Sequence, residues 1–177
     1  SVNVWGVHPD HCFEAIDKMA LLNICENIRD GAYIKEKIQK LTKRASSNKV
    51  AKIVPTWWNE VISILEFDSK PLAACNNFDK TVSFYTSSFH HIDRAIRKLY
   101  GLFLNEEKII RPLQEYYESI NHQLLQHWFD YTQEYKSNQQ GYLPLLLNVS
   151  KPKTAIIVGD GVRYEIAEGM AKITINR

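Results

Sequence analysis

Asp160 is the residue whose surroundings point most directly to chemistry. It stands between Gly159 and Gly161, just after the apolar run of residues 155–158, which is rich in β-branched side chains. Such a run predicts a buried strand, and ligands bind at the carboxyl ends of strands in open α/β sheets. A carboxylate there is a hard oxygen ligand for a divalent cation, and small neighbours let a substrate come close. We therefore expect a metal site for phosphoryl hydrolysis, with Asp160 as a metal ligand.

The residues after this turn predict a helix that packs back on the strand. Val162, Ile166 and Met170 recur every four residues, as expected for one buried helical face. The free N–H groups at the start of such a helix favour a phosphate. Residues 172–176 then form a candidate second strand. Because the sequence has no initiating Met and ends soon after Asp160, we expect the chain to be part of a longer protein.

Three other interpretations of the Asp160 turn stay open. Gly159 and Gly161 form part of a dinucleotide or methyl-donor motif, but Tyr164 occupies its third glycine position. Asp160 can instead be a structural residue that caps the following helix. It can also be a phospho-acceptor, a role that usually needs acidic neighbours from other strand ends.

Residues 155–168 resemble the opening of the PglZ domain, a branch of the alkaline phosphatase superfamily. In that family an apolar strand precedes Asp, a small residue, an aliphatic residue, Arg, an aromatic residue and Glu, and then a helix with small residues. Here these positions are held by Asp160, Gly161, Val162, Arg163, Tyr164, Glu165 and Ala167. The commonest family pattern has Ser before the Asp and Ala after it, where this chain has glycines. Residues 91–100 are similar to the helical stretch that precedes the PglZ domain.

The resemblance implies a catalytic role for the longer protein. Asp160 would be a ligand of a two-metal site, usually zinc, and Arg163 would contact a phosphate or support Asp160. The Ser or Thr nucleophile and the remaining Asp and His ligands would lie on later strands, past Arg177. The longer protein would be a cytoplasmic metal-dependent phosphohydrolase or phosphodiesterase in phage defence of the Pgl or BREX type, or in signalling. Its partners would be other proteins of those systems, and this chain alone would hold no metal and be inactive.

The rest of the sequence predicts a mainly α fold. Residues 1–150 are expected to form a helical bundle with a long arm, and residues 151–177 the truncated start of the α/β domain. Apolar periodicity places helices at 8–27, 33–45, 57–65 and along a seam from 92 to 135. Asp10 and Asn105 are expected to cap helices, Gly31 to end one, and Pro112 to kink the arm of residues 106–137 or to mark its start. That arm would be roughly 45–50 Å long.

Several polar and aromatic groups have structural interpretations. His90 and His91 would point about 100° apart on a helix, so only His90 and Asp93 share a face and a metal site there is not favoured. Trp57 and Trp58 are expected to supply one core anchor and one half-exposed ring. The three cysteines are widely spaced and are expected to be buried, reduced thiols. The apolar run 143–147 would strap the helices onto the next domain.

Charge distribution suggests a second function class, a helical module that binds proteins or nucleic acid. The net charge is only +2, which indicates no strongly charged partner for the whole chain. Residues 35–52, however, hold seven basic side chains against Glu36 alone: Lys35, Lys37, Lys40, Lys43, Arg44, Lys49 and Lys52. Such a segment can meet phosphates. No apolar run is long enough to cross a membrane, and apolar or aromatic surface left exposed could also pair two copies of the chain.

Overall fold

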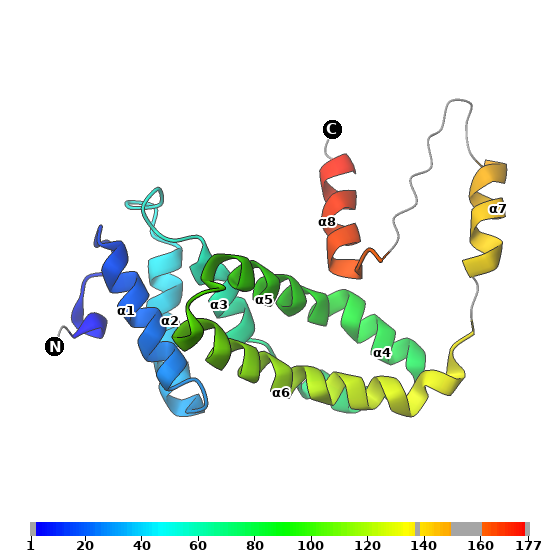
Figure 1. Cartoon of the computed structure of the whole chain (residues 1–177), viewed down its shortest axis with the longest axis horizontal. Coiled ribbons are helices and arrows are strands. Elements are labelled where there is room, and N and C mark those ends of the chain that lie inside the picture. The colour runs from blue at the N-terminus through cyan, green and yellow to red at the C-terminus, as the bar shows by residue number, and fades with distance from the viewer. Residues whose placement is uncertain (1–2, 137–138, 150–160, 176–177) are drawn as a thin grey trace.

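The protein is described by a computed structural model that covers residues 3–136, 139–149 and 161–175. Within these ranges it is mainly helical and contains no strand, which confirms the predicted mainly α fold (Figure 1). The expected strand of residues 155–158 lies outside the described residues. The helices are α1 (Glu14–Glu26), α2 (Gly31–Ala45), α3 (Trp57–Leu65), α4 (Phe78–Phe84), α5 (His90–Phe103), α6 (Glu107–Tyr131), α7 (Gln139–Val149) and α8 (Tyr164–Ile175).

A helical hairpin forms the centre of the molecule. α4 continues through a π-helical turn, η3 (Tyr85–Phe89), into α5, and this rod lies beside α6 (Figure 1). The predicted seam is confirmed as far as Leu124, because the following apolar residues of the hairpin are all buried: Ile92, Ile96, Leu99, Phe103, Ile110, Leu113, Ile120 and Leu124. Beyond Leu124 it weakens, since Trp128 and Tyr131 are only partly buried and Tyr135 is 49% exposed. α3 and α8 pack on α5, and α1 packs on α6.

α6 is shorter than expected. It has 25 residues, or ~37 Å at 1.5 Å per residue, and passes into a 3-10 turn, η4 (Thr132–Glu134). Pro112 lies inside the helix, where its missing N–H leaves one carbonyl of the preceding turn without its usual donor. α5 ends at Phe103 and α6 begins at Glu107, so a short connection interrupts the helical pattern there.

The helix-end predictions were wrong in three places. Asp10 does not cap α1, which begins at Glu14; its carboxylate instead accepts a hydrogen bond from the Ser47 hydroxyl at 2.6 Å. Gly31 is the first residue of α2, whose cap is the Asp30 side chain. Glu106, not Asn105, is the N-cap residue of α6. Asp10 is bound instead by a side chain that is close in space but distant in sequence. α2 and α6 begin at other residues than the sequence predicted.

The first three helices are held together by a buried ion pair. Asp17 of α1 is 1% exposed, and its Oδ2 accepts a 2.7 Å bond from Arg44 Nη2 of α2. Its Oδ1 accepts from Arg44 Nε at 2.9 Å and from Trp58 Nε1 of α3 at 2.8 Å. Trp57 is buried as well, so the expected half-exposed ring is not observed. Arg44, a residue of the basic segment, is therefore internal, and Lys37 of the same segment is buried as well.

The remaining predictions have mixed outcomes. Cys25 and Cys75 are buried free thiols, and burial raises the pKa of Cys25 to about 12, but Cys12 is exposed. The candidate strand of residues 172–176 was wrong where it is described, because residues 172–175 belong to α8, which continues the helical pattern. The apolar run 143–147 lies in α7, which includes Pro144.

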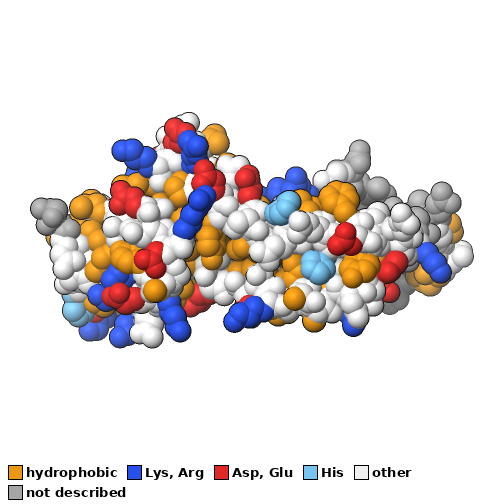
Figure 2. Space-filling model, turned by 90° about the horizontal axis from the view of Figure 1, so that it is seen from below, with side chains coloured by type: hydrophobic (Ala, Val, Ile, Leu, Met, Phe, Trp, Pro, Cys, Tyr) orange, Lys and Arg blue, Asp and Glu red, His pale blue; other side chains and the backbone are white. Residues whose placement is uncertain are grey.

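The surface carries mixed charge. On the face seen from below, basic, acidic and hydrophobic side chains are interspersed (Figure 2). This pattern agrees with the small net charge of +2. None of the helices in the described ranges has the length and apolar character needed to cross a membrane.

We predict that Asp17→Ala destabilises the fold by about 3–5 kcal/mol, because it leaves the buried Arg44 guanidinium without its counter-charge. Urea unfolding followed by circular dichroism measures the change. The exposed Asp130→Ala provides the control, with an expected change within about 0.5 kcal/mol. Equal stabilities for the two variants would contradict a role for this ion pair in holding α1, α2 and α3 together.

Candidate functional site

Of the predicted site residues, Arg163 directly precedes α8. Asp160, the expected metal ligand, lies outside the described residues. Gly161 has a φ of 64°, a left-handed conformation that favours glycine and supports the predicted turn. Arg163 has an exposed side chain, and its carbonyl oxygen accepts the first helical bonds, from Ile166 N at 3.1 Å and Ala167 N at 3.0 Å.

The predicted helix after the turn is confirmed as α8, but a different face of it is buried. Val162, Ile166 and Met170 are exposed, whereas Glu165 is only 2% exposed and faces α5. A carboxylate is rarely buried without a charged partner. Glu165 is therefore the residue that defines how α8 sits on the helical region.

Two arginines of α5 hold the start of α8. Arg97 Nε lies 2.7 Å from Glu165 Oε1, although its N–H does not point along that contact, so the pair is a charge contact rather than an aligned hydrogen bond. Arg94 Nη2 donates to the Glu165 carbonyl at 2.7 Å and to the Glu168 carboxylate. The side chain and the backbone of α8 are thus both bound by α5.

Beneath Glu165 lies a polar cluster centred on Asp93. Tyr85 of the π-helical turn donates its hydroxyl hydrogen to Asp93 Oδ2 at 2.8 Å, and Tyr117 of α6 donates to Oδ1. Tyr85 Oη also lies 3.4 Å from Glu165 Oε2, a weak contact because its one hydrogen is directed to the closer Asp93. Burial and the Asp93 carboxylate raise the pKa of both tyrosines, so they remain protonated donors.

His90 borders the same cluster. It is buried, its Nδ1 lies 3.3 Å from the Tyr85 carbonyl oxygen, and its ring meets Tyr164 of α8 edge to face. Its Nε2 is buried without a hydrogen-bond partner. His91 is exposed, but its ring centroid lies only 3.9 Å from that of His90, so the prediction that the two histidines point apart was wrong.

The chemistry of this junction is that of an anchor. Both Asp93 oxygens already accept hydrogen bonds, and Glu165 faces arginines, so neither carboxylate is directed at a metal ion. No group of three or more His, Cys, Asp or Glu side chains placed to hold a metal occurs in the part of the chain that the structure describes. The junction positions the segment that leads out of the Asp160 turn, and Arg163 beside that turn remains open to solvent.

The anchoring role of Glu165 was not predicted from the sequence. Glu165 was recognised only as a motif position, and the arginine partners were not identified. Arg94 and Arg97 are three residues apart and share a helical face, which was the available signal. Their partner is about 70 residues away in sequence, and spacing alone does not reveal such a pairing.

Comparison with known proteins gave no match: no family model, curated protein or solved structure resembles this chain significantly.

We predict that Glu165→Gln loosens α8 from α5. Loss of the charge that faces Arg94 and Arg97 is expected to lower the free energy of local opening of α8 by about 1.5 kcal/mol. This change corresponds to roughly tenfold lower hydrogen-exchange protection of the α8 amides. Mass spectrometry of exchange by peptide measures it, with the exposed Glu107→Gln as the control. Unchanged α8 protection in Glu165→Gln would rule out this contact as the anchor.

The Glu168 contact predicts a pH dependence. Hydrogen bonds from Lys172 and Arg94 lower the pKa of Glu168 from 4.5 to about 2. A depressed folded-state pKa means that this stabilisation is fully present above about pH 4.5 and is lost as the pH falls towards 2. The difference in α8 protection factor between the wild type and Glu168→Gln should therefore shrink between pH 6 and pH 3. A difference that stays constant over this range would contradict the assignment.

Proposed function

We propose that this chain is the helical region and the first motif of a PglZ-type metal-dependent phosphohydrolase or phosphodiesterase. One observation carries the proposal: the two stretches that resemble the family, residues 91–100 and 155–168, contact each other through Arg94, Arg97 and Glu165. These stretches are far apart in the sequence, and each was identified from residue type alone. Contact between them is expected if the helical stretch supports the start of the catalytic domain.

In this proposal the motif residues have separate roles. Asp160 is a metal ligand, in a site that zinc would occupy in the intact enzyme. Arg163 is exposed beside the turn and is available to a phosphate oxygen. Glu165 is a positioning residue, because its carboxylate is directed at Arg97 and away from solvent. The nucleophile and the remaining metal ligands would be supplied by other strands of the intact enzyme.

The substrate class follows from the proposed chemistry. Paired metal ions and an arginine stabilise the charge that develops on a transferring phosphoryl group. The intact protein would act in the cytoplasm on a phosphate ester, in phage defence of the Pgl or BREX type or in signalling, together with other proteins of those systems.

The test is Asp160→Ala in the full-length protein. We expect at least a 100-fold loss of zinc-dependent hydrolysis of bis(4-nitrophenyl) phosphate, with less zinc bound, because one metal ligand is missing. Arg163→Ala should lower activity while zinc content is retained. Asp130→Ala is the control and should keep both. Full activity in Asp160→Ala would remove this residue from the site and end the proposal.

A second candidate function is a helical interaction module without catalysis. It is favoured by exposed apolar side chains on α7 and α8, such as Leu145, Leu147, Ile166 and Ile173. Five lysines of the basic segment also remain exposed: Lys35, Lys40, Lys43, Lys49 and Lys52. Salt-dependent binding of this chain to duplex DNA, or capture of a partner protein or a second copy, would support it if the full-length protein had no hydrolase activity.

A further inference from the structure

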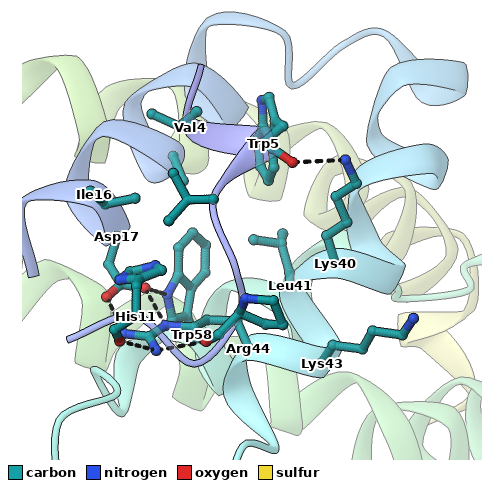
Figure 3. A pocket seen from close by; sticks show the side chains of 13 residues that line it. Val4, Trp5, His11, Ile16, Asp17, Lys40, Leu41, Lys43, Arg44 and Trp58 are labelled. Carbon is teal, nitrogen blue, oxygen red and sulfur yellow. Dashed lines mark hydrogen bonds and ion pairs between the residues drawn. The ribbon is translucent and has the colours of Figure 1, made fainter. Parts of the chain in front are cut away.

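A cavity of about 270 Å³ lies among the first helices of the chain and has no lining residue in α8. It is lined by the N-terminal segment with its 3-10 turn η1 (Val4–Gly6), by α1 and α2, and by Trp58 of α3, and it opens to solvent on one side (Figure 3). Its size is slightly below the range of roughly 300–1,000 Å³ that is typical of ligand pockets. It can hold one ring or a short aliphatic chain.

The base of this cavity is a rigid, fully paired structure. The Asp17 carboxylate accepts hydrogen bonds from Arg44 and Trp58 on both of its oxygens. Arg44 Nη1 also donates to the carbonyl oxygens of Pro9 and His11, both at 2.8 Å, and so holds the N-terminal segment over the cavity (Figure 3). The shape is therefore formed before any ligand arrives, which lowers the entropic cost of binding.

The walls are apolar and include two indole rings. Trp5 and Trp58 line the cavity together with Val4, Ile16, Ala20 and Leu41. Aromatic and aliphatic walls of this kind favour the body of an apolar ligand, by burying surface that water would otherwise cover.

The uncompensated charge around the cavity is positive. The negative charge of Asp17 is matched by Arg44, so Lys40 and Lys43 of α2 supply the excess. Both lysines are exposed, and Lys40 Nζ donates to the Trp5 carbonyl at 3.0 Å (Figure 3). Burial and Arg44 lower the pKa of His11, so this lining residue adds no positive charge at neutral pH. A ligand that places an anionic group beside Lys40 and Lys43 would complement this positive charge.

We propose that this cavity binds a small amphipathic anion, with a single ring or short chain against Trp5 and Trp58 and a carboxylate or phosphate near Lys40 and Lys43. The proposal is independent of Asp160 and of the hydrolase hypothesis, because the cavity shares no residue with α8. The ligand needs both an apolar body, which packs against the walls of the cavity, and an anionic group, which the two lysines attract.

Titration of the full chain with phenyl phosphate and with 4-phenylbutanoate tests the proposal. Calorimetry and the indole N–H signals of Trp5 and Trp58 in NMR spectra report on binding. We expect saturable binding of at least one anion with a Kd of roughly 0.1–1 mM, in line with its small size. Inorganic phosphate and benzyl alcohol, which each lack one half of the ligand, should bind at least tenfold more weakly.

Variants separate the two requirements. Ala20→Leu fills the cavity and should abolish binding, while Ala32→Leu on the exposed side of α2 should not. The double variant Lys40→Gln, Lys43→Gln should weaken binding about five- to tenfold, while Lys52→Gln should leave it unchanged. Both lysines are exposed, so the double variant tests the site even if Ala20→Leu does not fold.

Absence of saturable binding to either anion, equal affinity for benzyl alcohol, or an unchanged Kd in the double lysine variant would overturn the proposal.

Discussion

Every other part of the described structure depends on the pairing of the α4–α5 rod with α6. The two helical segments bury a continuous apolar seam between them, and burial of such surface is the main favourable term in folding. α1 packs against α6, while α3 and α8 pack against α5. Without the hairpin, neither the Asp17 ion pair nor the anchor at Glu165 would have a surface on which to form.

A polar group inside this seam specifies how the two helices align. Asp93 is buried, where an unpaired carboxylate would be costly, and both of its oxygens are satisfied only when Tyr85 and Tyr117 reach it. A slip of one helical turn between α5 and α6 would move Tyr117 away from Asp93. The apolar seam supplies the stability, and the Asp93 cluster restricts the hairpin to one register.

The sequence predicted the parts of this structure that depend on local spacing. The three- and four-residue intervals from Ile92 to Leu124 placed the hairpin seam correctly, because helical periodicity is a local property. Asp10 and Asn105 failed as caps, since side-chain partners and the exact start of a helix depend on the tertiary structure. Arg44 looked like part of a basic surface and is instead a buried partner of Asp17, 27 residues away. Glu165 was found as a motif position, but its anchoring role depends on a contact that no local pattern records.

The π-helical turn at Tyr85–Phe89 changes which face of the α4–α5 rod is directed toward α6. A π turn contains one more residue than an α-helical turn, so residues before it are rotated by about 100° relative to those after it. α4 and α5 can therefore each present a buried face to α6 although their apolar residues do not follow a single helical repeat. Loss of one residue here, for example Ser87, would leave both helices intact and rotate Phe78 away from its contact with Trp128. The packing of α4 on α6 therefore depends on the length of this short segment more than on the identity of its exposed side chains.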